Sequence, residues 1–447
     1  MRRSSLFAVL LLLLALPAAA AEPSWQAGFA KVKITPSTPM WMSGYASRKA
    51  PAEGTESDLF ARAMVLRDAD GRTAVLVSLD LVGIDRNLSK AMADSIQTRH
   101  KVLREGIAFA TSHTHSGPVL GSTLRSMYFF SPEEAQKVAD YTAALPKLVD
   151  RAVDEAFANL APVTLSWAQG TAGFAVNRRE NVEKDVPAIR EKGELKGPID
   201  HAVPVLAARD AKGKLVGLVF GYACHATVLS DQKWCADYPG YAATGLEAKH
   251  AGAVALFVAG CGADQNPIPR RSVALAKTYG QQLSAAVNEV LAAPMRALKP
   301  HWRGTYATID LPLHAIPTRD ALVADSMNAD KYIAARAKML LKQLETEGSI
   351  PKTYPYPIQT WRLDDLAMVL LGGEVVVDYS LRIKKELPGK TWPIAYANDV
   401  MAYIPSLRVL KEGRYEGATS MVYYGLPSVW GEAVEELIVA EVVRQGK

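Results

Sequence analysis

The chain has 447 residues, 22% of them charged, and a formal net charge of only +5. Its length is sufficient for one large domain or two ordinary ones. The basic residues are scattered along the chain, which excludes the concentrated positive surface of a nucleic-acid-binding protein, so no nucleic-acid partner is expected.

The first residues have the pattern of a signal peptide. Met1-Arg2-Arg3 is a short basic start, an unbroken apolar run occupies 6–16, and small residues follow up to Ala21. The apolar run is shorter than the roughly 20 residues that a membrane-spanning helix needs, although a retained N-terminal anchor stays open. We therefore expect 1–21 to be a signal peptide, the chain to be exported to the periplasm or the medium, and 22–447 to form a single catalytic domain.

Apolar, β-branched runs alternate with helical patterns along the rest of the chain. The runs predict buried strands at 73–79, 107–110, 215–222, 253–258 and 366–371. Helices are predicted at 131–160, 271–291, 319–347 and 430–444, with Pro146 expected to kink or break the first. This alternation predicts an α/β fold with a central β-sheet flanked by helices.

His113 and His115 follow the strand predicted at 107–110. Side chains two residues apart in an extended segment share a face, so both imidazoles can project into one site. One can bind a metal ion while the other binds substrate or moves a proton, since histidine is both the commonest metal ligand and a group that titrates near neutral pH. An ordinary polar role for the pair stays open.

Two further strand ends carry metal-binding side chains. His225 follows the strand predicted at 215–222, and Glu374 follows Gly372-Gly373 after the strand at 366–371. Two histidines and a glutamate are the ligand set of many catalytic zinc sites, which keep one position open for water. Taken singly, His225 is better explained as a buried core histidine and Glu374 as a solvated carboxylate at a strand end.

Other residues have weaker signals. Asp80 follows the strand at 73–79 and is either a site residue or a turn acid, and Asp237 is either a support for His225 or part of a turn. The aromatic cluster at 127–130 is either a pocket wall or lid, or core. Cys224 and Cys235 can form a disulfide in an exported chain, or all three cysteines, Cys261 included, are buried apolar residues.

The chain resembles the neutral, non-lysosomal ceramidase family at several segments in the same order. Ser112 to Pro118 reproduces the family's Ser-His-Thr-His-Ser-Gly-Pro run, Gly372-Gly373-Glu374 resembles its Pro-Gly-Glu segment, and 403–406 resembles its Tyr-Ile-Thr-Thr segment. Asn177-Arg178 and the Arg-Tyr-Glu run at 414–416 also match. The resemblance implies the family's catalytic fold and a zinc ion held by four ligands: His113, His225, Glu374 and Tyr403. It also implies that His115 and Arg178 lie in the active site.

The sequence departs from the family in two respects. The family's nucleophilic serine lies in a Gly-Asp-Val-Ser-Pro segment, and aligning Asp264 and Pro267 with it puts Asn266 at the serine position. An amide cannot be that nucleophile, but it can donate a hydrogen bond to an oxyanion. The family's C-terminal immunoglobulin-like domain is also expected to be missing, because the sequence ends soon after the catalytic region. Both departures leave the substrate open.

These residues predict a zinc-dependent hydrolase that uses water activated by the metal, because bound zinc lowers the pKa of its water to about 7. We expect His115 to move the proton, Arg178 and Asn266 to stabilise developing charge, and Asp264 to orient a ligand or act as a base. The leading substrate is an amide in an N-acyl lipid or a related small molecule, with peripheral membrane contact. The alternatives are a zinc hydrolase of a polar or sugar-containing substrate and a non-catalytic binding protein.

Overall fold

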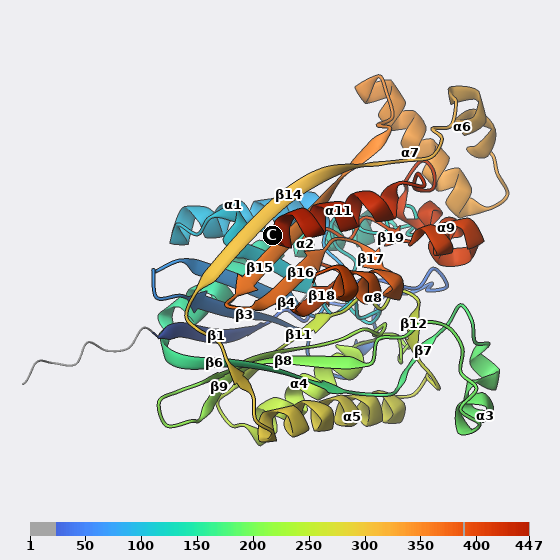
Figure 1. The fold of residues 1–447 in the computed structure, drawn as a ribbon. Coiled ribbons are helices and arrows are strands. Elements are labelled where there is room, and N and C mark those ends of the chain that lie inside the picture. The colour runs from blue at the N-terminus through green and yellow to red at the C-terminus, as the bar shows by residue number, and fades with distance from the viewer. Residues whose placement is uncertain (1–23, 388, 447) are drawn as a thin grey trace, which may run out of the picture.

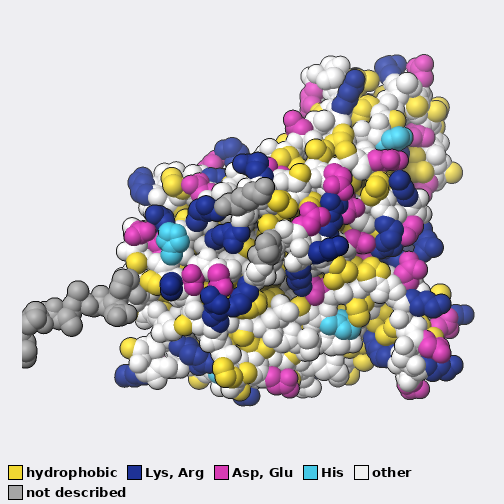
Figure 2. Space-filling model, in the orientation of Figure 1, with side chains coloured by type: hydrophobic (Ala, Val, Ile, Leu, Met, Phe, Trp, Pro, Cys, Tyr) yellow, Lys and Arg dark blue, Asp and Glu magenta, His cyan; other side chains and the backbone are white. Residues whose placement is uncertain are grey.

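The computed structural model describes residues 24–387 and 389–446. The signal peptide predicted at 1–21 lies outside the described residues. Within them, no helix is both long and apolar enough to cross a bilayer. Basic and acidic side chains are intermingled over the face shown in Figure 2.

The largest element of the fold is a nine-stranded mixed sheet (Figure 1). In spatial order its main strands are β11 (Val254–Ala259), β9 (Leu215–Tyr222), β8 (Ala202–Arg209), β6 (Ala161–Thr171), β1 (Trp25–Lys33), β3 (Phe60–Arg67), β4 (Thr73–Leu79) and β5 (Ile107–Thr111), with β13 (Arg296–Ala297) beside β6. The pair at each end, β9 with β11 and β4 with β5, is parallel. The predicted histidines come just after the carboxyl ends of β5 and β9, which are one strand from each of these two pairs.

The sheet is curled so that its two ends approach each other. Strands β1 and β6, which join the two halves, pair through only three residue pairs. Ser78 of β4 donates a hydrogen bond to the Phe257 carbonyl of β11 at 2.5 Å, although these strands lie at opposite ends of the sheet order. Chain segments that leave β5 and β9 therefore emerge close together.

A second sheet of four strands packs against the first. Its order is β14 (Trp302–Pro312), β15 (Thr353–Leu363), β16 (Leu366–Leu371) and β18 (Lys390–Ile394). Trp361, Met368 and Trp392 from this sheet share one buried apolar cluster with Trp25 and Leu256 of the large sheet. The sequence had indicated only one sheet, with the 366–371 strand in it.

Helices cover the outer faces of both sheets. On the large sheet, α1 (Arg86–His100) and α2 (Pro132–Ala158) cover one half, and α4 (Asp237–Lys249) and α5 (Val273–Ala292) cover the other. On the small sheet lie α8 (Val377–Glu386) and α11 (Val434–Gly446), while α6 (Arg319–Asp325) and α7 (Lys331–Glu347) project from the body (Figure 1). The predicted α/β class, with a large central sheet flanked by helices, is confirmed.

Short elements complete the chain and carry several site residues. They are β2 (Gly54–Thr55), β7 (Ala175–Asn177), α3 (Val186–Glu191), β10 (Lys233–Trp234), β12 (Gln265–Pro267), β17 (Glu374–Val375), β19 (Tyr403–Ile404), α9 (Leu407–Glu412) and α10 (Met421–Tyr424).

Two helix predictions are corrected. The chain stays helical through Pro146 without a break, because burial of Leu145, Val149 and Val153 against the sheet outweighs the one hydrogen bond that proline removes. The helix predicted at 319–347 is two helices, because Asp330 caps the second by accepting hydrogen bonds from the amides of Tyr332 and Ile333.

Asp80 has a structural role in this fold. Its carboxylate accepts hydrogen bonds from the Arg62 guanidinium at 2.8 Å and the Phe60 amide at 2.9 Å, and both side chains of the ion pair are 3% exposed. A buried ion pair of this kind keeps its charges only because each satisfies the other. Asp80 therefore anchors β4 to β3.

Candidate metal centre and active site

Three separate strand ends deliver the predicted metal ligands to one place. His113 lies two residues after β5, His225 lies three residues after β9, and Glu374 opens β17. Strand β17 pairs in parallel with β19, with Glu374 directly opposite Tyr403. Gly373 before it has a φ of 73°, and a Cβ there would meet Ile404 at 2.6 Å, so this close pairing of β17 and β19 depends on glycine.

The four side chains converge within hydrogen-bonding distance. The Glu374 Oε2 atom lies 3.0 Å from His113 Nε2 and 3.1 Å from His225 Nε2. The Tyr403 hydroxyl lies 3.3 Å from His225 Nε2. All four residues are at most 3% exposed.

The hydrogen bond that Nδ1 of each histidine makes determines which ring nitrogen is left to bind a metal ion. His113 Nδ1 contacts the Val82 carbonyl at 2.5 Å, and His225 Nδ1 contacts the Gly262 carbonyl at 3.0 Å. A carbonyl only accepts, so both Nδ1 atoms carry a proton, and Nε2 is the atom that presents a lone pair to Glu374 when a ring is neutral. Two lone pairs then face a carboxylate oxygen at about 3 Å, an arrangement that a shared cation satisfies. This donor set fits Zn²⁺, which accepts histidine nitrogen and carboxylate oxygen in open catalytic sites.

Burial determines the ionisation of these groups. Desolvation, helped by the Arg178 charge, lowers the pKa of His225 to about 4, so the ring is neutral at pH 7. Burial alone would raise the pKa of Glu374, yet the facing His113 and His225 hold that pKa well below its usual range. Neutral imidazoles and an ionised carboxylate are the forms that bind a metal ion.

Glu374 and Tyr403 are each held by a second partner. The Tyr424 hydroxyl donates a hydrogen bond to Glu374 Oε1, the oxygen that does not face the histidines. The Trp430 indole donates to the Tyr403 carbonyl at 2.8 Å, and Arg178 donates to the Tyr403 hydroxyl at 3.1 Å. Such outer contacts fix the orientation of ligands around a metal ion.

Arg178 and Asn266 lie together beside this centre. The antiparallel pairing of β7 with β12 puts Asn266 opposite Val176, and Arg178 follows directly after β7. Arg178 donates to Asn266 Oδ1 at 3.2 Å and to Glu416 at 2.8 Å. Because the amide oxygen is already accepting, the Asn266 N–H₂ group is the part left to donate to a ligand.

Asp264 supports the site from behind. Its carboxylate accepts hydrogen bonds from the Val377 amide at 2.9 Å and from Asn177 at 3.2 Å, and it does not line the cavity at the site. Burial raises the pKa of Asp264 to about 6. The predicted base or ligand-orienting role stays a prediction, and these contacts favour a positioning role for the loop that carries Asn266.

His115 lies between the metal ligands and an open cavity of about 490 Å³. Its Nε2 is 3.1 Å from His113 Nε2, while its Nδ1 is buried without a hydrogen-bond partner among the described residues. The ligand nitrogens of His113, His115 and His225 lie within 4.8 Å of one another, so geometry alone permits His115 as a third metal ligand. Desolvation followed by the charges of His113 and His225 lowers the pKa of His115, which keeps it neutral.

Sequence reasoning missed three residues of the site. Tyr45 stacks edge-on against His115 with ring centroids 4.8 Å apart, and Thr227 lies within 3.5 Å of Asn266 Oδ1. Thr227 stands two residues after His225, so the alternation that linked His113 to His115 could have identified it. Tyr424 and Tyr45 had no such signal, because they come from segments far from any histidine.

The other sequence-level candidates have structural surroundings. Asp237 accepts a hydrogen bond from the Leu229 amide at 2.9 Å and supports the loop after His225. In the aromatic cluster, Tyr128 bonds Ser43 at 2.9 Å, whereas Phe129 is 47% exposed. Cys224, Cys235 and Cys261 are all free and buried, so of the two alternatives for the cysteines the described residues show buried apolar side chains and no Cys224–Cys235 disulfide.

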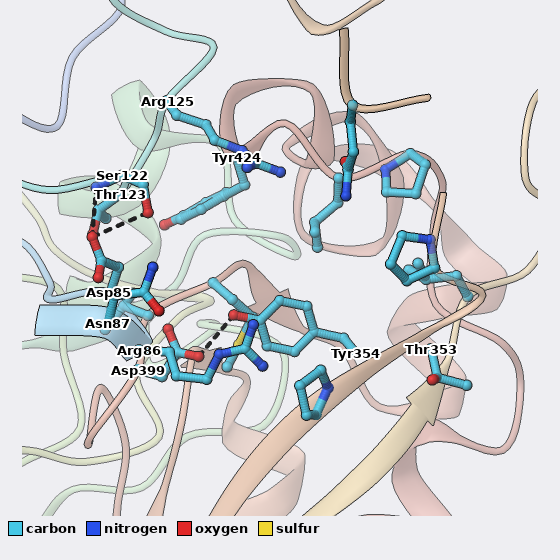
Figure 3. A pocket seen from close by; sticks show the side chains of 18 of the residues that line it. Asp85, Arg86, Asn87, Ser122, Thr123, Arg125, Thr353, Tyr354, Asp399 and Tyr424 are labelled. Atoms are coloured by element: carbon cyan, nitrogen blue, oxygen red, sulfur yellow. Dashed lines mark hydrogen bonds between the residues drawn. The ribbon is translucent and has the colours of Figure 1, made fainter. Parts of the chain in front are cut away.

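A second cavity of about 240 Å³ lies on the other side of Tyr424 (Figure 3). Tyr424 reaches from its wall to Glu374, while Tyr354 donates a hydrogen bond to Asp399 at 2.7 Å. None of the predicted site residues lines this cavity. Burial, opposed by the Tyr354 hydrogen bond, raises the pKa of Asp399 to about 7.

This shift predicts a pH dependence of stability. The folded pKa of Asp399 is above its unfolded value, so the neutral carboxyl stabilises the fold fully below about pH 4, and this contribution is lost as the pH rises to about 7. In Asp399→Asn that loss is absent. The measurement is the free energy of unfolding in urea at pH 5 and pH 8. The stability of Asp399→Asn relative to the wild-type protein should be greater at pH 8 than at pH 5, by about a few kcal/mol. An equal difference at both pH values would contradict the assignment.

The comparisons with known proteins agree with this geometry. Residues 25–266 match the family described as neutral/alkaline non-lysosomal ceramidase, N-terminal. The neutral ceramidase of Pseudomonas aeruginosa is 29% identical over 270 residues, which cover 58% of this chain and 40% of that protein. The neutral ceramidase of Drosophila melanogaster is 26% identical over 239 residues, which cover 51% and 32%. The chain thus matches about two fifths or less of the length of these relatives.

The fold is similar to that of solved neutral ceramidases. The crystal structure of the Pseudomonas aeruginosa protein superposes with a TM-score of 0.74 at 21% identity, over 95% of this chain and 74% of that one. A second structure, of a ceramidase complexed with C2, superposes with a TM-score of 0.73 at 19% identity. At this identity the likeness concerns the fold.

Proposed function

The chain belongs to the neutral/alkaline non-lysosomal ceramidase family, and from this premise we propose that it is an exported, zinc-dependent amide hydrolase. Its substrate is an N-acyl compound, either a lipid or a related small molecule. Export rests on the leader predicted at 1–21, and contact with a membrane surface stays a prediction.

One observation carries the proposal. The Nε2 atoms of His113 and His225 lie 3.0 and 3.1 Å from the same Glu374 carboxylate oxygen, while both Nδ1 atoms are bonded to backbone carbonyls. His113, His225 and Glu374 would hold the ion, with Tyr403 beside them. When bound, zinc supplies a Lewis acid and lowers the pKa of a coordinated water to about 7.

The remaining residues would act on the substrate. Hydrolysis of R–CO–NH–R′ with one water gives R–COO⁻ and R′–NH₃⁺, so one group must take a proton from water and return it to the departing nitrogen. His115 is neutral and lines the cavity, which suits both tasks. The Arg178 guanidinium and the Asn266 amide face the same space and would stabilise negative charge on the carbonyl oxygen.

Metal content and turnover should be measured on one preparation of the purified mature chain. We expect about one zinc per chain by elemental analysis, and cleavage within a panel of N-acyl amides that includes ceramides, polar amides and glycosides. Zinc binding with cleavage of glycosides alone would favour the polar-substrate alternative. Zinc binding without any turnover would favour a binding protein.

Asn266 offers a separate test of the site. Asn266→Ala removes the donor next to Arg178 and should lower kcat about 10²-fold, which is the usual loss for one oxyanion donor. Asn266→Asp is the matched control, since it keeps the shape but replaces the donor with a carboxylate, and it should be no better. Full activity in Asn266→Asp would exclude a donor role.

A further inference from the structure

The cavity at the metal centre is unusually rich in arginine. Five arginines line it against two glutamates: Arg178, Arg179, Arg270, Arg271 and Arg414, with Glu183 and Glu416. His115, Tyr403 and Asn266 belong to the same lining, so these charges and the candidate metal centre face one cavity.

Three of the arginines have carboxylate partners. Arg178 and Arg179 share Glu416 at 2.8 and 2.6 Å, and Arg179 also contacts Glu412 at 2.7 Å. Arg270 contacts Glu183 through two hydrogen bonds of 2.8 and 2.5 Å. These charges are balanced within the protein.

Arg271 and Arg414 differ from the other three. Neither forms an ion pair with any carboxylate in 24–387 or 389–446. Among the described residues, the Arg271 guanidinium donates a hydrogen bond to the Tyr45 hydroxyl at 3.4 Å, and that of Arg414 donates to the Arg179 carbonyl at 2.8 Å. Both residues are exposed. The cavity therefore has two cationic groups without an internal counter-charge.

The backbone at both positions is strained. Arg271 has a φ of 88° and Arg414 a φ of 59°, in the left-handed region that costs a side-chain-bearing residue on the order of 1 kcal/mol or more. Residues kept in such conformations gather at ligand sites, where the strain fixes the direction of a side chain. Both arginines therefore combine a strained backbone with a place in the lining of one cavity.

Arg271 is close to the reacting centre. Its guanidinium carbon lies 5.6 Å from the Tyr45 ring centroid, and that ring lies 4.8 Å from the His115 ring. A small or medium-sized molecule can therefore contact His115 and Arg271 together. An uncharged N-acyl lipid would supply no anionic partner for this guanidinium or for that of Arg414.

We propose that the substrate carries an anionic group, a carboxylate or a phosphate, which binds Arg271 and Arg414 while its amide lies at the metal centre. This inference rests on the proposed amidase function and narrows its substrate class. Guanidinium groups suit these anions because they form paired, charge-assisted hydrogen bonds with them.

The test compares substrates that differ only in charge. All three substrates have the same acyl chain. N-acylglycine carries a carboxylate where the neutral N-acylethanolamine carries a hydroxymethyl group. The phosphate ester of N-acylethanolamine is the substrate that carries a phosphate. With the zinc-loaded protein we expect kcat/KM to be at least about tenfold higher for one of the anionic substrates, as for hydrogen bonds to a charged group. The better anion identifies which of the two is bound.

Variants then locate the effect. In Arg271→Gln and Arg414→Gln the ratio of anionic to neutral kcat/KM should fall towards one, and high salt should reduce the ratio in the wild-type protein. Arg319→Gln is the control, because Arg319 is exposed and lies outside the cavity, and it should leave the ratio unchanged.

Calorimetric binding of the same compounds separates this inference from the amidase proposal. If the wild-type protein binds an anionic amide more tightly than a neutral one, loses this preference in Arg271→Gln, and turns over neither compound, the inference is supported and the amidase proposal is overturned. Equal turnover of neutral and anionic amides would overturn the inference and leave the amidase standing. Absence of both binding and turnover would overturn both.

Discussion

His113→Ala is expected to lose zinc and amide hydrolysis together, with turnover falling by about three orders of magnitude or more. The imidazole Nε2 lies 3.0 Å from Glu374 Oε2, and its other nitrogen is fixed by the Val82 carbonyl. Removal of this ring leaves His225 as the one imidazole beside Glu374 and Tyr403, so the site loses half of its nitrogen donors for zinc. Metal and activity should therefore be lost in the same variant.

For the wild-type protein and each variant, the zinc bound per chain is measured after dialysis. Amide hydrolysis is then measured with zinc added back. His113→Cys provides a thiolate that zinc also accepts, so it should recover part of the bound metal and show that the chain still folds. His314→Ala is the control, because His314 is exposed and away from the cavity. A His113→Ala protein that binds zinc as tightly as the wild type would remove His113 from the ligand set.

His115→Ala is expected to retain zinc and to lose about 10³-fold in kcat, as for loss of a group that transfers protons. Its ring lines the cavity and contacts His113, whereas Glu374 Oε2 lies against only His113 and His225. Because burial lowers the pKa of His115, the neutral base form is present at pH 7 and is lost as the pH falls through that lowered pKa. The acid limb of the pH–rate profile should therefore disappear in the variant.

Zinc analysis of His115→Ala separates two roles that the geometry alone leaves open. One ring nitrogen from each of His113, His115 and His225 lies within 4.8 Å of the others, near enough to share one ion. Loss of zinc from His115→Ala would make His115 a ligand. Retained zinc with partial recovery of turnover by added imidazole would support proton transfer.

The strands that the sequence predicted best are those buried on both faces. The runs 73–79, 215–222 and 366–371 coincide with β4, β9 and β16, and two others differ from β5 and β11 by one residue. Continuous apolar runs identify such strands without reference to neighbours. Strands β1 and β6 were missed because lysine, glutamine and threonine interrupt their apolar residues.

The sequence predicted the start of a helix well where a capping side chain sets it. Ser131 accepts a hydrogen bond from the Glu134 amide and caps α2, and Pro132 opens the helix within one residue of its predicted start at 131. Pro146 did not break α2, because packing on the sheet supports the helix through the missing hydrogen bond. The break between α6 and α7 depends on Asp330, which caps α7. The sequence prediction missed this cap because it relied on helical periodicity.

The sequence by itself determined the chemistry of the candidate site. His113 and His115 are two residues apart at a strand end, so their shared face follows from the alternation of an extended chain. The order of the matching segments around His225, Glu374 and Tyr403 implied the other candidate ligands through the family resemblance. These features are local, and each can be read without knowing where the rest of the chain lies.

Only the tertiary structure decided that these residues meet. Strands β5 and β9 lie near opposite ends of the sheet order, and the curl of the sheet brings His113 and His225 together around Glu374. It also turned Asp264 away from the cavity, brought Tyr424 to Glu374, and left Arg271 and Arg414 without carboxylates. Such outcomes depend on twist and packing summed over many strands, and no short stretch of sequence encodes them.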